Sequence, residues 1–142
     1  MLDLTYENDD CININEYVDD ILSLTYDTTS SSPRNIAFVT DCMELATCVQ
    51  WKQPHFPVFL KLSKDKSVND SIGFIKSNNL LGLFIDHNLL QRVPDLIQAI
   101  KEAGVMIIAY SNNQLQLNKP ILNGVDGLLD YDQFYCYTNV SQ

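Results

Sequence analysis

The chain has 142 residues, of which 46% are hydrophobic and 10% aromatic, with five glycines and five prolines. This composition is typical of a globular domain and excludes a disordered, collagen-like or disulfide-stapled chain. Eighteen acidic residues against nine basic ones give a formal net charge of −9. Such a charge disfavours binding to the phosphate backbone of nucleic acids.

Membrane insertion and secretion are not indicated. No apolar run reaches the about 18–20 residues that cross a bilayer, and residues 1–5 lack the basic start of a signal peptide. The four cysteines (Cys11, Cys42, Cys48 and Cys136) form no CxxC pair and have no histidine at metal-ligand spacing. They are expected to be reduced thiols. The sequence predicts a soluble protein of the cytoplasm, with the nucleus as a second compartment.

Six short segments predict strands, because strands covered on both faces are near-continuously apolar. They span residues 2–6, 35–40, 57–62, 80–86, 105–110 and 126–129. They recur about every 20–25 residues, except that a polar loop at residues 28–33 lengthens the first interval.

Amphipathic segments between these strands predict four helices. They span residues 15–26, 43–53, 68–79 and 89–103. Pro94 falls near the first turn of the fourth helix, where proline is tolerated. Residues expected at the helix ends are Asn13 or Asn15, Asp41 with Glu44 in an approximate capping box, Ser67, and Gly104.

A strand–helix unit repeated in this way predicts an α/β fold with parallel strands and right-handed crossovers. Six consecutive units suit either an open doubly wound sheet or most of a (β/α)8 barrel. No linker divides the chain. We therefore expect one domain over residues 1–132, followed by a C-terminal tail over residues 133–142.

Two stretches, PRNIAFVTD at residues 33–41 and WKQPHFPVFL at residues 51–60, resemble the glycerophosphodiester phosphodiesterase domain of fungal proteins. Residues 77–83, 100–105 and 124–129 resemble it too. The resemblance covers about residues 2–132. It is nearest to the fungal branch that holds glycerophosphocholine phosphodiesterases and a degenerate domain in a cyclin-dependent-kinase inhibitor of the phosphate response. It implies the C-terminal three quarters of a (β/α)8 barrel of the phospholipase-C-like phosphodiesterase type.

The resemblance also bears on catalysis. The family's catalytic histidine pair and two of its acidic metal ligands lie in the first two barrel units, whereas this sequence aligns from the third. His55 and His87 match neither the HRG nor the HD motif of the family. The third strand normally has Glu-x-Lys, for which this chain has Asp3 and Thr5. Tyr110 stands where the seventh strand usually has Trp. No catalytic residue is therefore assigned.

Active sites of such barrels lie at the C-terminal ends of the strands. Asp3 and Asp86 are candidate ligands there for a divalent cation, Ca²⁺ or Mg²⁺, as the family uses. Lys61 and Tyr110 are candidate substrate-binding residues. Further polar residues expected at this end are Thr40, Asp41, His87, Ser111 and Asp130.

Structural roles compete with these functional ones. Asp41 and Asp86 are better explained as helix caps, and Asp130 as a turn residue. His87 is expected in a solvated loop, because neighbours in a strand point to opposite faces and Asp86 would not orient it. His55 lies between a helix and a strand at the opposite end of the barrel, where a structural role is expected. The sequence contains no GxSxG, GxGxxG or Walker motif.

Two functions follow from the resemblance. The first is a non-catalytic domain, degenerate or truncated, with a regulatory or scaffolding role in phosphate homeostasis. The alternative is the C-terminal part of an active, metal-dependent glycerophosphodiester phosphodiesterase of glycerophospholipid metabolism, whose catalytic histidines precede Met1. The partners implied are an upstream barrel half, SPX- or ankyrin-type domains of a longer protein, and a cyclin–kinase complex.

The strand count carries one further expectation. Six strands where eight close a barrel leave residues 2–6 and 126–129 as sheet edges with unpaired backbone groups. Apolar faces at these edges would be exposed. We therefore expect the chain to self-associate or to require further strand–helix units.

Overall fold

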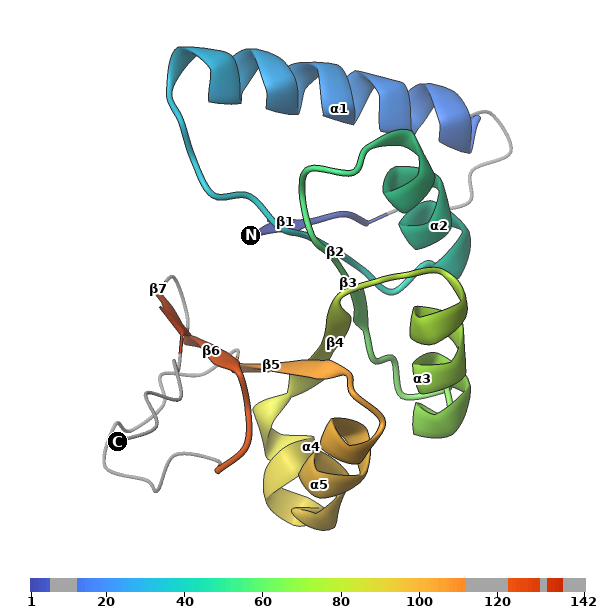
Figure 1. The fold of residues 1–142 in the computed structure, drawn as a ribbon, viewed down its shortest axis with the longest axis vertical. Coiled ribbons are helices and arrows are strands. Elements are labelled where there is room, and N and C mark those ends of the chain that lie inside the picture. Colours follow the sequence, from blue (N-terminus) through green and yellow to red (C-terminus); the bar gives the residue numbers. More distant parts are fainter. Residues whose placement is uncertain (6–12, 112–122, 131–132, 137–142) are drawn as a thin grey trace.

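A computed structural model describes residues 1–5, 13–111, 123–130 and 133–136. Its strands form one seven-stranded sheet in which neighbours along the sequence are neighbours in space (Figure 1). The strands are β1 (Leu2–Asp3), β2 (Phe38–Thr40), β3 (Val58–Lys61), β4 (Gly82–Asp86), β5 (Met106–Ser111), β6 (Gly127–Asp130) and β7 (Gln133–Cys136). The helices are α1 (Ile14–Ser31), α2 (Met43–Lys52), α3 (Val68–Ser77), α4 (His87–Arg92) and α5 (Asp95–Glu102).

Strands β1 to β6 are parallel and the helices alternate with them. The sheet curls, with its helices on the outer side, so that the six parallel strands form part of a barrel wall (Figure 1). The barrel-fragment architecture expected from the sequence is confirmed. The strands follow one another in the sheet in the order of the sequence, as in a barrel. In a doubly wound sheet, by contrast, the strand order reverses at a switch point.

Each central strand packs on both faces. Alternate residues such as Phe38, Leu60 and Leu83 are fully buried under the helices. The residues between them form a second, smaller apolar cluster on the inner face, made of Val39, Phe59, Phe84 and Ile108. Burial on both sides explains why the strands appeared in the sequence as continuous apolar runs.

Helix α1 is longer than expected and absorbs most of the predicted polar loop at residues 28–33. Its last turns are held by hydroxyl groups that donate to carbonyl oxygens one turn earlier. Thr28 Oγ1 donates to Leu24 O at 2.7 Å and Ser31 Oγ to Asp27 O at 3.0 Å. These side chains therefore bond within the helix and do not end it, although Ser and Thr more often favour turns.

The predicted helix over residues 89–103 is two helices, α4 and α5, separated at Val93 and Pro94. Helix α4 begins at His87, directly after β4, so Pro94 would have fallen well inside a continuous helix. Proline there lacks the N–H for the helical hydrogen bond and clashes with the preceding turn. The expectation that Pro94 would be tolerated within one helix was wrong, because the helix start was placed too late.

The helix ends follow the prediction in part. Asn13 caps α1 by accepting a hydrogen bond from the backbone N–H of Asn15 at 3.0 Å. Gly104 follows α5 with a φ of 77°, the left-handed conformation that glycine adopts readily. Asp41 was wrongly expected to cap α2: the cap position is Cys42, with no side-chain hydrogen bond. Ser67 does occupy the cap position of α3, also with no side-chain hydrogen bond.

The sheet edges differ from the expectation on one side. Strand β6 is not an edge, since β7 pairs with it in antiparallel orientation. Strand β7 begins at Gln133, within the segment expected to be a C-terminal tail. At the other side β1 pairs with β2, and the sheet order ends there. One parallel edge strand and one antiparallel edge strand therefore border the sheet.

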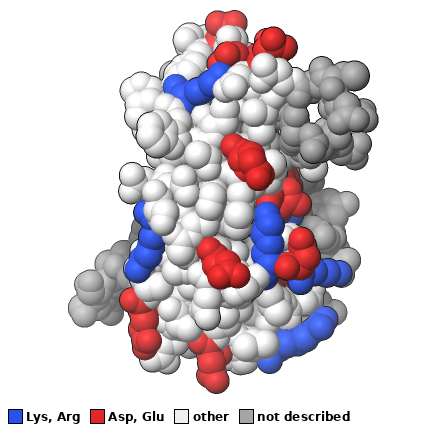
Figure 2. Space-filling view, turned by 90° about the vertical axis from the view of Figure 1, so that its right-hand side faces the viewer, with Lys and Arg blue, Asp and Glu red and all other residues white. Residues whose placement is uncertain are grey.

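The described helices include none that is both long enough and apolar enough to cross a membrane. On the face that carries α2 and α3, basic and acidic side chains are interleaved and do not gather into one basic patch (Figure 2).

Candidate functional site

The candidate site lies on the inner face of the sheet, at the C-terminal ends of the strands. The strand register brings Lys61 on β3 level with Phe84 on β4, and Phe84 level with Ile108 on β5. Two residues further along these strands, Asp86 on β4 is paired with Tyr110 on β5. Because side chains two residues apart in a strand share a face, Lys61, Phe84 and Tyr110 all project to the inner side.

Lys61 and Asp3 form the charged pair of this site. The Lys61 Nζ lies 2.8 Å from Oδ2 of Asp3, across strand β2. Burial lowers the pKa of Lys61, but the hydrogen bond and the negative charge of Asp3 outweigh it, so the pKa stands above its ordinary value. Lys61 is therefore a permanent cation at neutral pH.

Two aromatic rings form one wall. Phe84 and Tyr110 stack nearly parallel, with centroids 4.6 Å apart and planes inclined by 8°. The Lys61 ammonium lies 5.4 Å from the centroid of the Tyr110 ring, within the range of a cation–π interaction. Burial raises the pKa of the Tyr110 hydroxyl, with further increases from Asp86, Asp3 and Asp41 against the opposing effect of Lys61.

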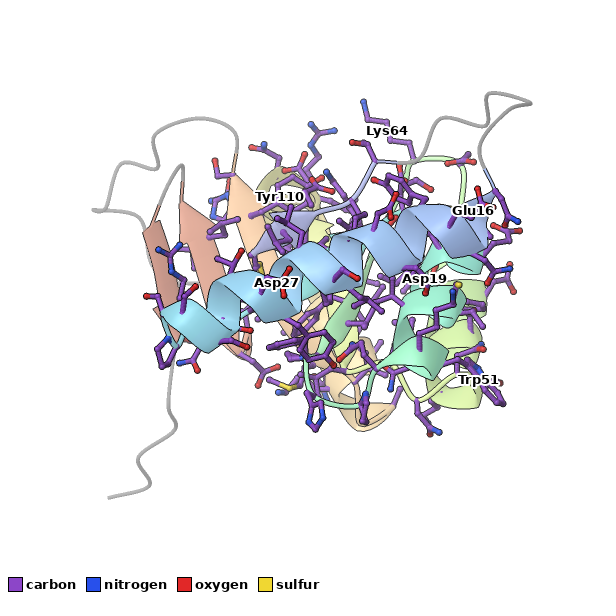
Figure 3. All side chains as sticks on the ribbon, turned by 90° about the horizontal axis from the view of Figure 1, so that it is seen from above. Glu16, Asp19, Asp27, Trp51, Lys64 and Tyr110 are labelled. Carbon is purple, nitrogen blue, oxygen red and sulfur yellow. The ribbon has the colours of Figure 1, made fainter. Side chains whose placement is uncertain are left out.

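These groups surround a small cavity of about 150 Å³. Its lining residues are Met1, Asp3, Val39, Lys61, Phe84, Tyr110, Ser111 and Leu129. Pockets for drug-sized ligands usually measure roughly 300–1,000 Å³. This cavity therefore suits a small polar group rather than a lipid chain. Figure 3 places Tyr110 towards the same end of the sheet as Lys64, with Trp51 towards the opposite end.

The candidate metal ligands are engaged in other interactions. The Asp86 carboxylate accepts from the Asn88 backbone N–H at 2.8 Å and so caps α4, which was the structural alternative for this residue. Asp3 is paired with Lys61. Among the described residues no group of three or more His, Cys, Asp and Glu side chains could hold a metal ion. Since Ca²⁺ and Mg²⁺ take about six or more oxygen ligands, the residues described do not fit the divalent cation that the family resemblance implies.

Other predicted residues lie at this end of the sheet without joining the cavity. Thr40 is buried and accepts a hydrogen bond from the Cys42 N–H at 3.2 Å. Lys66 Nζ donates to the backbone oxygen of Asp41 at 2.7 Å. The exposed Thr5 accepts a hydrogen bond at its carbonyl from the Tyr17 hydroxyl at 3.1 Å.

The two histidines have different surroundings. His87 is buried, with 6% of its surface exposed, as the first residue of α4, so the expected solvated loop position was wrong. The early start of α4 at the end of β4 explains this burial. The His55 ring contacts Tyr26 edge-on, with centroids 6.3 Å apart. Cys11 and the side chains of Asp130 and Cys136 lie outside the described residues.

Phe84 is a site residue that sequence reasoning passed over. In the sequence it is one more apolar residue of a buried strand. A usable signal existed, because Phe84 lies two residues before Asp86 and must therefore share its face. The alternation of side chains along a strand therefore predicts an aromatic residue on the same face as the charged candidates.

Known proteins resemble this chain in sequence, and one solved structure resembles it in fold. The phosphate system positive regulatory protein PHO81 of Saccharomyces cerevisiae is 26% identical over 158 residues, covering 82% of this chain and 13% of that protein. The ankyrin repeat protein nuc-2 of Neurospora crassa is 27% identical over 154 residues, covering 72% and 14%. The glycerophosphocholine phosphodiesterase GDE1 of Candida albicans is 28% identical over 130 residues, covering 83% and 11%. The chain thus spans a small fraction of the length of these relatives.

No protein-family model matches the sequence. The crystal structure of a glycerophosphodiester phosphodiesterase from Parabacteroides distasonis superposes with a TM-score of 0.62 at 16% identity. The match covers 91% of this chain and 51% of that one, so this sheet corresponds to part of a larger barrel. The chain is thus similar in sequence to these relatives and has the fold of part of a glycerophosphodiester phosphodiesterase barrel.

Proposed function

We propose that this chain is a non-catalytic glycerophosphodiester phosphodiesterase-like domain with a regulatory or scaffolding role in phosphate homeostasis. The observation that carries the proposal is the 2.8 Å ion pair between Lys61 and Asp3. It places a lysine ammonium on the carboxylate that the resemblance assigns to metal binding.

Hydrolysis of a phosphodiester by this family needs a metal to polarise the phosphate and a histidine pair for acid–base transfer. A divalent cation would have to displace Lys61 from Asp3 and would find Asp86 bonded to the start of α4. His87 directly follows Asp86 in the sequence. The Asp86 carboxylate accepts hydrogen bonds from the backbone and side chain of Asn88. The described residues thus supply neither a metal site nor an acid–base pair.

Support for the regulatory role comes from the relatives. One is named a positive regulator of the phosphate system and another an ankyrin repeat protein. We infer that the domain acts beside repeat domains of a longer protein and contacts signalling partners such as a cyclin–kinase complex. Cytoplasm and nucleus are the compartments that this role requires.

One observation favours the alternative function. The glycerophosphocholine phosphodiesterase GDE1 is as similar to this chain as the regulatory relatives are. In that case the chain would be the C-terminal part of an active enzyme, with its histidines and remaining carboxylates supplied upstream of Met1. An in-frame HRG motif and a Glu-x-Asp motif in the preceding coding sequence would restore this alternative.

The experiment is a hydrolysis assay with purified chain, glycerophosphocholine and either Mg²⁺ or Ca²⁺. The bacterial glycerophosphodiester phosphodiesterase of known structure serves as the positive control. We expect no release of glycerol phosphate above a heat-killed sample. Release that disappears in Asp3→Ala would contradict the proposal, because it would show a working metal site at Asp3.

A further inference from the structure

A sequence motif at the end of α1 is not used by the candidate site. The chain has five prolines, which directly follow Ser32, Gln53, Phe56, Val93 and Lys119. Ser32 is thus the only serine or threonine of the sequence with a proline after it. Proline-directed protein kinases select such a residue, because their site for the next residue offers no partner to a backbone N–H, which proline lacks.

Ser32 is exposed and its hydroxyl is free to react. Residues 30–35 are all exposed, and the chain runs from the end of α1 to β2 as an extended stretch (Figure 1). Ser32 itself is extended, with φ −149° and ψ 101°, as proline favours in the residue before it. The hydroxyls of Thr28 and Ser31 donate to carbonyl oxygens within α1, whereas that of Ser32 forms no hydrogen bond with any described residue.

The last turn of α1 opens at low cost. Residues 28–31 are all serine or threonine, which form helices less readily than alanine. Hydroxyl groups that bond back to the preceding turn also destabilise a helix slightly. The turn contains no basic side chain to favour the negative end of the helix dipole. Residues 30 and 31 can therefore leave the helix, so that Ser32 enters a kinase within an extended segment.

A phosphate at Ser32 would oppose the helix. A phosphoserine carries a charge of about −1.5 to −2 at neutral pH, and the carboxyl end of a helix disfavours negative charge. Arg34, two residues further on, is exposed and forms no ion pair with the described residues. Its guanidinium can donate to two phosphate oxygens at once. The phosphate is thus repelled by the helix end and attracted to the loop.

We propose that Ser32 is a phosphorylation site for a proline-directed protein kinase, and that its phosphate unwinds the last turn of α1. The Ser32 Oγ attacks the γ-phosphorus of ATP, a new O–P bond forms there, the bond from that phosphorus to the bridging oxygen breaks, and ADP leaves. The hydroxyl proton passes to the catalytic base of the kinase. Thr28 and Arg34 line the same groove as Leu2 of β1, so the modification changes the surface beside the sheet edge.

The first test is the transfer of phosphate to the whole chain. The purified chain is incubated with ATP, Mg²⁺ and a purified mitogen-activated protein kinase, which is proline-directed, and the modified residues are mapped by mass spectrometry. Ser32→Ala removes the acceptor, and Pro33→Ala removes the recognition residue. Ser30→Ala is the matched control, because Ser30 is exposed in the same segment and is not followed by proline. Thermal melts establish that each variant is folded.

We expect one phosphate per chain, at Ser32, in the native and Ser30→Ala proteins. Ser32→Ala should accept none, and Pro33→Ala should lose most of the modification. The assignment of Ser32 is overturned by no transfer to the native chain, by transfer to other residues, or by equal transfer to Pro33→Ala.

The second test measures the last turn of α1 directly. The chain phosphorylated at Ser32 is compared with the unmodified chain by amide hydrogen exchange. A chain with phosphoserine incorporated at Ser67 during synthesis is the control for added charge. Ser67 is an exposed cap residue at the amino end of α3, where the helix dipole favours a negative charge.

Phosphate at Ser32 should speed the exchange of the amides of residues 28–32 by about two- to fivefold, the size of helix-dipole effects on local opening. Phosphate at Ser67 should leave these amides unchanged. Unchanged or slower exchange after phosphorylation of Ser32, or an equal rise with phosphate at Ser67, overturns the unwinding. None of these results bears on the proposed function, which the hydrolysis assay tests separately.

Discussion

The side chain of Gln53 forms two hydrogen bonds with the backbone of Phe56. Its Nε2 donates to the Phe56 carbonyl at 2.8 Å, and its Oε1 accepts from the Phe56 N–H at 2.7 Å. Gln53 is 1% exposed and follows the end of α2. The amide thereby closes the turn that leads into β3, within the WKQPHFPVFL stretch that carried the family resemblance.

Gln53→Glu should therefore destabilise the domain. The carboxylate can still accept from the Phe56 N–H, but it cannot donate to the carbonyl, and it buries a charge. We expect a loss of about 1–3 kcal/mol in the free energy of unfolding, measured by urea denaturation. Gln50→Glu, on the preceding helical turn, is the control and should change stability by less than about 0.5 kcal/mol. Equal effects of the two substitutions would contradict the role given to Gln53.

Gly82→Ala should destabilise the sheet where β4 meets β5. A Cβ at residue 82 would lie 2.9 Å from the carbonyl carbon of Met106 and would also clash with its oxygen, and backbone atoms cannot move aside easily. We expect a cost of about 1–3 kcal/mol from overpacking.

Gly73→Ala is the matched control for this substitution. Gly73 lies within α3, and a Cβ there meets nothing within 4 Å. Alanine should stabilise the helix by about 0.5–1 kcal/mol. Thermal melts of both variants check the pair, and a Gly82→Ala protein as stable as the native chain would show that β4 and β5 are further apart than described.

The Lys61–Asp3 pair should weaken in alkali. Burial of Lys61 lowers its pKa, but the hydrogen bond to Asp3 and the negative charges of Asp3, Tyr110 and Asp41 together outweigh burial and raise the pKa above the ordinary 10.5. A raised pKa means that the folded chain binds more protons than the unfolded chain, so this contribution is complete below about pH 10.5 and is lost as pH rises through the folded pKa. The raised pKa of Tyr110, due first to burial, acts in the same direction.

Urea titrations between pH 8 and 12 measure this dependence. The native chain should lose stability across the upper part of that range more steeply than Lys61→Met, which retains the contributions of Tyr110 and of Cys42, whose pKa values burial also raises. Lys64→Met should follow the native curve. Identical slopes for the native chain and Lys61→Met would show that the ion pair adds nothing to stability.

Self-association through the β1 edge is a further expectation. Met1 and Leu2 are 41% and 40% exposed, and Leu24 on α1 is 70% exposed. These three residues line one groove between β1 and α1. Light scattering should show a mass that rises with protein concentration and falls in Leu24→Glu. Leu81→Glu, an exposed leucine outside this groove, is the control. A monomer at all concentrations would mean that the open sheet is self-sufficient.

Much of the fold could be predicted because strands that are buried on both faces of a parallel sheet are continuous apolar runs in the sequence. The strands predicted at residues 35–40, 57–62 and 80–86 agree to within a few residues with β2, β3 and β4. The helix bounds were less certain, since polar residues such as Thr28 can either end a helix or bond within it. That choice depends on what the helix packs against.

The sequence by itself determined the α/β class, the repeated strand–helix order and the set of polar residues at the strand ends, because these follow from local periodicity. Only the tertiary structure decided which of those residues meet. Lys61 and Asp3 are 58 residues apart and lie on strands separated by β2, so their contact depends on strand register and sheet curvature. Asp86 became a helix cap because α4 begins immediately after β4, and the β7 pairing depends on a neighbour, β6, that local sequence does not specify. Long-range pairing of this kind is set by the packing of the whole sheet, to which each short segment contributes only a part.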